Sequence, residues 1–264
     1  MQKEMNVNNQ AAWDQSPYEA WQRRYGTPIA AAEKLMRNPS AVLSSFEPYI
    51  SPLSGKKVIN LLGSHGSKSV AMALLGAEAT VVDFAMGNAR YAEELAAAAG
   101  VSIRYIVSDV LELPEAELTQ DYDLVLMEFG ILHYFMDLRP LMHIVSRLLG
   151  EGGRLVLQDF HPVSTKLISS KGTTQTIRKH RVDGDYFDES VEEVDVPYLK
   201  FLPLQHQADL KKTQLRRWTL GEIVTSVAAE GLFIEMLKEE PNQSSELFDQ
   251  GIPKTFTLLA KKLG

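Results

Sequence analysis

Acidic side chains follow several short apolar runs of this sequence and could accept hydrogen bonds from a bound ligand. Asp83 ends the run 78–83, Asp109 follows the run 103–107, and Glu128 ends the next run. An acid just past the second strand of an α/β unit can accept both hydroxyls of a ribose. Residues 58–66, VINLLGSHG, predict a buried strand, a glycine turn and the start of a helix. Such a turn brings backbone close to the rest of a nucleoside.

Two histidines follow predicted strands and are candidates for proton transfer. His133 lies just past the strand predicted at 122–127, and His161 follows the strand predicted at 153–158. A neutral imidazole near pH 7 is a competent base, so we predict a catalytic role for both. The alternative is that either histidine satisfies a buried backbone group or orders its loop. We expect Glu128 to line the ligand pocket rather than act as the base.

Strands alternate with helices along the middle of the chain and would position these residues. Because short apolar strands separated by helices favour parallel pairing, we predict a mostly parallel, doubly wound α/β sheet of seven strands, covered by helices on both faces. Thr219 and Glu222 form a capping-box pattern at the start of a further helix. The expected strands are 57–62, 78–83, 103–107, 122–127, 153–158, 232–237 and 256–260, and the expected earlier helices are 66–75, 87–99 and 137–149.

Three segments differ in pattern and suggest the domain organisation. Residues 1–50 should form an N-terminal helical segment packed on the core, with a loose tail over about the first twelve residues. The core should comprise 51–162 and 216–264. The polar, charged stretch 163–215 should be an inserted α/β or β cap, since so long an irregular segment is usually functional or disordered.

Aromatic residues gather in the N-terminal segment and in the cap. They either dock the helices on the core or cover a ligand, and we name five as substrate-contact candidates. These are Trp13, Tyr18, Trp21, Tyr25 and Trp218. Residues 173–178 and 214–218 are candidate cap strands.

Composition narrows the function classes. The formal net charge of −7 argues against a protein that grips nucleic acid by its phosphates. The chain has no cysteine, which excludes disulfides, thiolate zinc sites and cysteine nucleophiles. No His/carboxylate cluster suggests a metal site, and no apolar run approaches membrane-spanning length. We therefore expect a soluble, cytoplasmic protein that acts on a small molecule.

Over residues 40–162 and 216–262 the chain resembles the class I S-adenosylmethionine-dependent methyltransferases. In that family the first strand carries an acid and leads into Gly-x-Gly-x-Gly. Here Asn60 replaces the acid, Leu62 and Ser64 replace two glycines, Gly63 lies one position off, and Gly66 coincides. Losing two glycines should restrict positive φ and the close approach of backbone to a ligand.

The resemblance implies roles at the strand ends. Asp83 would hold the ribose with Phe84 beside the adenine. Asp109 would accept from the adenine amino group, and the amide of Val110 would reach a ring nitrogen. Further cofactor contacts would come from the first turn, facing the methionyl part, and from the end of the fourth strand; these are Asn60, Leu61, Gly63, Ser64, His65, Gly66, Glu128 and Phe129.

The resemblance implies methyl transfer from S-adenosyl-L-methionine to a small-molecule acceptor, with S-adenosyl-L-homocysteine as product. Two alternatives stay open. One is a non-catalytic module that binds S-adenosylmethionine or another nucleoside. The other is a different nucleoside-cofactor enzyme on this fold, such as an aminopropyl transferase or an oxidoreductase. A dehydrogenase would show Gly-x-Gly-x-x-Gly and a P-loop enzyme Gly-Lys-Ser/Thr, and residues 63–66 fit neither.

Overall fold

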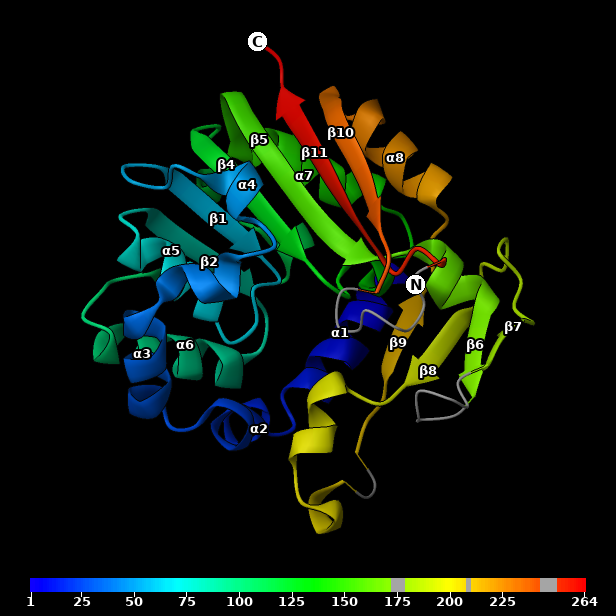
Figure 1. Cartoon of the computed structure of the whole chain (residues 1–264), viewed down its shortest axis with the longest axis horizontal. Coiled ribbons are helices and arrows are strands. Elements are labelled where there is room, and N and C mark those ends of the chain that lie inside the picture. The colour runs from blue at the N-terminus through cyan, green and yellow to red at the C-terminus, as the bar shows by residue number, and fades with distance from the viewer. Residues whose placement is uncertain (172–178, 208–209, 243–250) are drawn as a thin grey trace.

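A twisted sheet of seven strands forms the centre of the computed structural model (Figure 1). The structure describes residues 1–171, 179–207, 210–242 and 251–264, and it describes the side chains of all of these residues except those at 170–180. The strand order is β10-β11-β5-β4-β1-β2-β3. Strands β1 to β5 pair in parallel, and β11 pairs antiparallel with both β5 and β10. The predicted sheet is confirmed. Its strands are β1 (Lys57–Leu61), β2 (Glu78–Asp83), β3 (Arg104–Val107), β4 (Tyr122–Glu128), β5 (Leu149–Phe160), β10 (Leu232–Glu240) and β11 (Thr255–Lys262).

Alternate residues of the strands enter two hydrophobic cores, one on each face of the sheet. In β1, Val58 joins one core, whereas Ile59 and Leu61 join the other. This alternation follows from the two-residue period of a strand. Helices α2 (Pro17–Tyr25), α3 (Pro28–Arg37), α5 (Ser67–Leu74) and α6 (Met86–Ala98) cover the first face, and α7 (Arg139–Leu148) and α8 (Leu220–Ala229) cover the second. The short α4 (Glu47–Ile50) precedes β1. No helix in the described part of the chain is long and apolar enough to cross a membrane.

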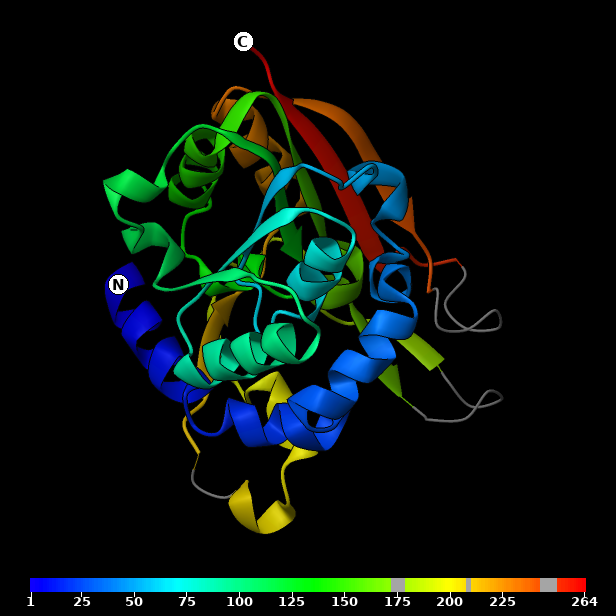
Figure 2. The same ribbon diagram turned by 90° about the vertical axis from the view of Figure 1, so that its left-hand side faces the viewer.

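The first residues form a helix, α1 (Gln2–Trp13), where a loose tail was expected, so that prediction is wrong. Figure 1 shows α1 at the carboxyl ends of the parallel strands, and Figure 2 shows it from the side. Its Asn and Gln side chains bind distant backbone: Gln2 donates to the carbonyl of Tyr134, and Asn9 exchanges two hydrogen bonds with the backbone of Gln214. These bonds, together with the buried Met5 and Ala12, hold the helix in place.

The inserted segment forms two small antiparallel sheets (Figure 1). They are β6 (Ile168–Lys171) with β7 (Lys179–Val182), and β8 (Val191–Val194) with β9 (Thr213–Arg216). Residues 214–216 of the second candidate cap strand are therefore in a strand. The first candidate, 173–178, lies outside the described residues.

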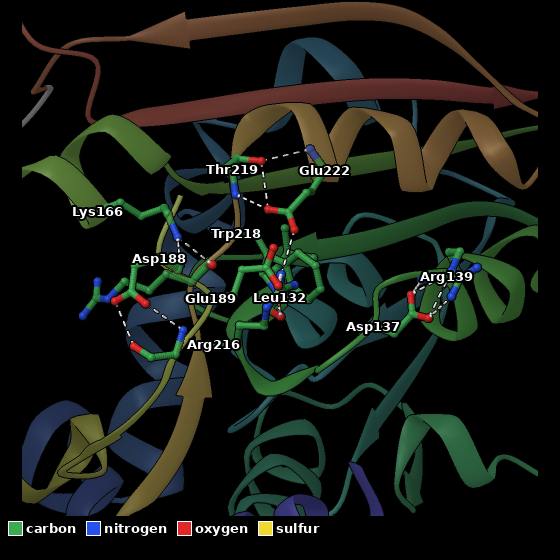
Figure 3. A network of polar contacts seen from close by, with 12 residues as sticks. Leu132, Asp137, Arg139, Lys166, Asp188, Glu189, Arg216, Trp218, Thr219 and Glu222 are labelled. Carbon is green, nitrogen blue, oxygen red and sulfur yellow. Dashed lines mark hydrogen bonds and ion pairs between the residues drawn. The ribbon is translucent and has the colours of Figure 1, made fainter. Parts of the chain in front are cut away.

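A polar network fastens this insertion to the core (Figure 3). The buried Arg216 guanidinium binds Glu222 of α8 at 2.8 Å and Glu189 at 3.2 Å, and lies 3.8 Å from the centre of the Trp218 ring. Thr219 and Glu222 form the predicted capping box of α8. The indole N–H of Trp218 donates to the carbonyl of Leu132, at 2.9 Å. The end of the insertion is thereby tied to the loop that follows β4.

Candidate functional site

A cavity of about 380 Å³ opens at the carboxyl ends of β1, β2, β3 and β4. This edge is where parallel α/β sheets bind ligands, and the volume is that of a small-molecule site. Helices α1, α2 and α5, the loop after β4, the last residue of β5 and Pro197 contribute the remaining walls. The lining residues are Asn6, Asn9, Trp13, Tyr25, Leu62, Gly63, Ser64, His65, Lys68, Val82, Asp83, Phe84, Ser108, Asp109, Val110, Glu128, Phe129, Gly130, Ile131, His133, Tyr134, Phe135, Phe160 and Pro197.

The turn after β1 keeps left-handed backbone without the expected glycines. Leu62 has φ 51° and Ser64 has φ 48°, at the two positions where the sequence replaces glycine, and Gly66 has φ 70°. The expected restriction is therefore wrong for the backbone shape. Left-handed conformation costs an L-residue about 1–2 kcal/mol, so the surrounding structure must stabilise this turn.

Asn60 lies beneath the turn and does not reach the cavity. It is 1% exposed, and a Cβ atom built on Gly63 would lie 2.0 Å from its Oδ1. Position 63 is thus restricted to glycine by the amide packed under it. Leu61 and Gly66 are also absent from the cavity wall, so three of the expected contacts shape the turn from behind.

Asp83 lines the cavity and also holds the turn. Its Oδ1 accepts from the backbone N–H of Ala85 at 2.9 Å and from Asn88 Nδ2 at 3.1 Å, and its Oδ2 accepts from the N–H of Ser64 at 3.1 Å. Burial raises the pKa of this carboxyl, and the three hydrogen bonds oppose that rise. A carboxylate has about four lone-pair positions, so one on Oδ2 remains for a ligand hydroxyl.

Asp109 faces the cavity at the end of β3 and is bound by helix α1. Its Oδ2 accepts from Asn6 Nδ2 at 2.5 Å, while its Oδ1 accepts from the N–H of Leu111 at 3.0 Å. Phe84 and Val110 also line the cavity, each next in sequence to one of the two acids.

At the end of β4, Glu128 forms an ion pair with Lys68 of α5 inside the cavity. Phe129 follows with φ 31°, a strained conformation for a bulky residue, and its ring lies 5.3 Å from that of Phe160. The buried Asp159 carboxylate holds this loop, accepting from the N–H of Gly130 at 2.6 Å. The loop that carries Phe129 is therefore fixed by the strand beside it.

His65 stacks inside an aromatic cluster at one end of the cavity. Its ring centre lies 4.8 Å from that of Trp21 and 4.7 Å from that of Tyr25. Burial, with the charge of Lys68, lowers the pKa of His65 to about 3, and its buried Nδ1 has no hydrogen-bond partner in the described part of the chain. This imidazole is neutral at pH 7.

The structure separates the five aromatic substrate candidates. Trp13 and Tyr25 line the cavity, and Trp13 Nε1 donates to the Tyr134 hydroxyl at 3.2 Å. Trp21 lies behind His65, donating to Asn88. Tyr18 binds Glu94 and does not line the cavity, and Trp218 lines a separate, smaller cavity.

The two candidate bases occupy different surroundings. His133 lines both the main cavity and the small cavity next to it. Burial, followed by the charge of Arg217, lowers the pKa of His133 to about 4, so its ring is neutral at pH 7. His161 lies outside the cavity: its Nε2 binds Glu239 at 2.6 Å, and its Nδ1 accepts from the N–H of Val163 at 3.1 Å. These bonds give His161 the structural role that was its alternative.

Sequence reasoning missed several residues of the wall, including Lys68, Asn6, Tyr134 and Phe160. One of them carried a signal. Lys68 is in the first turn of a helix, where a cation is opposed by the helix dipole, and such a placement indicates a specific partner. Asn6 carried none, because its contact with Asp109 joins positions far apart in the chain.

Part of the chain is similar in sequence to a known protein family. Residues 58–153 match the family described as "Methyltransferase domain". Two demethylmenaquinone methyltransferases are similar to part of the chain. The one from Clavibacter sepedonicus is 25% identical over 45% of this chain and 47% of its own length, and the one from Thermobifida fusca is 31% identical over 40% of this chain and 44% of its own. The chain thus spans about half the length of these relatives.

A solved S-adenosylmethionine-dependent methyltransferase from Mesorhizobium loti is similar in structure across most of the chain. The TM-score is 0.64 at 18% identity, with 86% of this chain and all (100%) of that chain covered. A putative methyltransferase of the same kind from Listeria monocytogenes gives a TM-score of 0.63 at 18% identity, covering 86% of this chain and 98% of its own. Residues 58–153 therefore match a methyltransferase-domain family, and the chain as a whole shares the fold of these two solved proteins.

Proposed function

We propose that this protein transfers a methyl group from S-adenosylmethionine to a small-molecule acceptor. The observation that carries the proposal is the 380 Å³ cavity at the carboxyl ends of the parallel strands, whose wall includes Asp83, Asp109 and Glu128 from the ends of β2, β3 and β4. Carboxylate oxygens can accept hydrogen bonds from the hydroxyl and amino groups of a nucleoside, and a carboxylate can also receive a ligand cation. When bound, the cofactor supplies a methyl group already activated by its positive sulfur.

The protein's part in such a reaction is to bind, orient and exclude water. Asp83 would accept from a ribose hydroxyl through the free position on Oδ2, and Asp109 would accept from the adenine amino group. Phe84 and Val110, which line the cavity, would flank the base, and the turn at 63–65 would face the methionyl part. Helix α1 covers this end of the cavity and limits the entry of water.

The acceptor would lie toward the loop after β4. Phe129, Tyr134 and Phe160 make that side of the cavity aromatic, which suits a flat apolar molecule. The related proteins named above act, by their names, on demethylmenaquinone. We assign His133 as the group that orients the acceptor and takes its proton, because the ring is neutral at pH 7 and lines the cavity. A pKa of about 4 restricts it to acceptors whose proton is acidic or becomes acidic on methylation.

We retain the cytoplasm as the proposed location of the protein.

Titration calorimetry with S-adenosylmethionine and S-adenosylhomocysteine tests the first half of the proposal. We expect both to bind, and Asp83→Ala to weaken both strongly. Asp123→Ala is the matched control, because Asp123 lies at the opposite edge of the sheet and pairs with Lys56. If the wild-type protein gives no binding heat with S-adenosylmethionine and none with S-adenosylhomocysteine, the methyltransferase assignment is refuted.

Turnover on a panel of small aromatic and quinone-like acceptors tests the second half. If His133 takes the proton, His133→Ala should lower the rate about 10²–10⁴-fold while cofactor binding is retained. His161→Ala should leave the rate per folded molecule unchanged. Binding without any product across the panel would favour the non-catalytic alternative.

A further inference from the structure

Lys68 and Glu128 form a charge pair inside the cavity, and the proposed function gives Lys68 no role. The two side chains are 25% and 15% exposed, and they come from different elements, the first turn of α5 and the end of β4. Of the described residues on the cavity wall, Lys68 alone carries a positive charge at pH 7. A cation in the first turn of a helix is also disfavoured by the helix dipole. The pair is therefore kept against an electrostatic cost.

The acid that the resembling family carries in its first strand is replaced here by a neutral residue, Asn60. Asn60 is neutral, buried under Gly63 and absent from the cavity wall. Asp83 already accepts three hydrogen bonds, and Asp109 accepts two. Among the described residues, the carboxylate of Glu128 has one partner, the ammonium of Lys68. Glu128 is thus the acid best able to receive a ligand cation beside the turn.

Strand order places this pair at one end of the ligand's path. The edge runs from Asp109 on β3, through Asp83 on β2 and the turn after β1, to Glu128 on β4. Neighbouring strands lie about 4.8 Å apart, so the outer two acids are separated by three such steps, or about 14 Å. With the base at β3 and the ribose at β2, the far end of an extended nucleoside would reach the turn and β4.

We propose that Lys68 and Glu128 recognise the amino-acid end of the cofactor, a deepening that rests on the proposed function. The Lys68 ammonium binds the α-carboxylate, and the Glu128 carboxylate binds the α-ammonium. In the free protein the two side chains neutralise each other, so neither charge is left buried without a partner. A zwitterionic ligand replaces the Lys68–Glu128 ion pair with two ion pairs, one to each side chain. A ligand with a single charge would pair with one of the two side chains only.

The test compares S-adenosylhomocysteine with 5′-methylthioadenosine, which has the nucleoside and thioether but no amino-acid end. Calorimetry on the full chain gives both affinities. We expect wild type to prefer S-adenosylhomocysteine, and Lys68→Met and Glu128→Gln each to weaken it about 10–100-fold, the effect of losing one hydrogen bond to a charged group. Neither variant should change the affinity for 5′-methylthioadenosine by more than about twofold.

Two further variants separate recognition from folding. Lys56→Met removes an ion pair with Asp123 at the opposite edge of the sheet, and it should leave both affinities unchanged. The double variant Lys68→Met/Glu128→Gln leaves no unpaired charge, so it should fold as wild type does and bind the two ligands with similar affinity. Equal weakening of both ligands by the single variants, or no weakening of either, would overturn the inference alone. Failure of wild type to bind either nucleoside would overturn the proposed function and this inference with it.

Discussion

Replacing Ser64 with glycine should stabilise the protein, although most substitutions destabilise. Ser64 has φ 48°, and left-handed backbone costs an L-residue about 1–2 kcal/mol. Glycine removes that cost but adds about 0.4–1 kcal/mol of conformational entropy to the unfolded chain. The structure gives the Ser64 hydroxyl no hydrogen bond to another described residue, so nothing else is lost. The expected gain is about 0.8 kcal/mol.

The matched control is Ser44→Gly, the same chemical change at an exposed residue with φ −54°. There glycine relieves no strain, so it should destabilise by about 0.4–1 kcal/mol. Urea unfolding of the ligand-free protein measures both, and the m-value should stay constant. The difference between the two variants, about 1–2 kcal/mol, is then the strain at Ser64 itself. Equal destabilisation by both would refute the argument that the turn stores strain.

Three other predictions follow from buried polar groups. The pKa values of His65 (about 3) and His133 (about 4) lie below the unfolded value near 6.5, so the unfolded state binds more protons in this range. The free energy of unfolding should therefore fall as the pH drops from about 6.5 toward 4, and at pH 5 each histidine should account for a loss of about 2 kcal/mol. His65→Asn should make the free energy of unfolding, measured in urea, depend less steeply on pH over this range. Glu222→Ala should lower the free energy of unfolding by about 3 kcal/mol, because it removes a cap of α8 and a partner of buried Arg216. Glu189→Ala removes a carboxylate that binds the same guanidinium but is 74% exposed, so it should lower the free energy of unfolding by less than about 0.5 kcal/mol. Similar losses for the two variants in thermal or urea unfolding would contradict this prediction. Asn6→Ala should speed amide exchange in α1 about 10–100-fold, and Asn8→Ala, which loses only an exposed bond to the carbonyl of Lys212, should change it little.

The sheet was predictable because its signals are local. Apolar runs of strand length, separated by helices, predicted β1 to β5 along the chain, and the capping box at Thr219 predicted the start of α8. The acids at the strand ends could be placed on one edge for the same reason, since parallel strands present their carboxyl ends together.

The errors arose where tertiary contacts override local preference. Helix α1 contains many Asn and Gln residues, which resemble a loose tail until their distant hydrogen-bond partners are known. Leu62 and Ser64 adopt glycine-like backbone because Asp83 and the packing around them hold the turn. His133 and His161 both follow strands, and only the path of each loop determines which ring reaches the cavity.

The hydrogen bond between Asn6 and Asp109 affects how an experiment at Asp109 must be interpreted. In the free protein the amide of Asn6 takes one of the two acceptor positions on Oδ2 of this carboxylate, so a ligand amino group on the same oxygen would share it with Asn6. The contribution of Asp109 to ligand affinity is therefore coupled to a donor that helix α1 supplies. Asp109→Ala would remove an acceptor and release α1 at once, so a double-mutant cycle with Asn6→Ala is needed to divide its effect between affinity and helix docking.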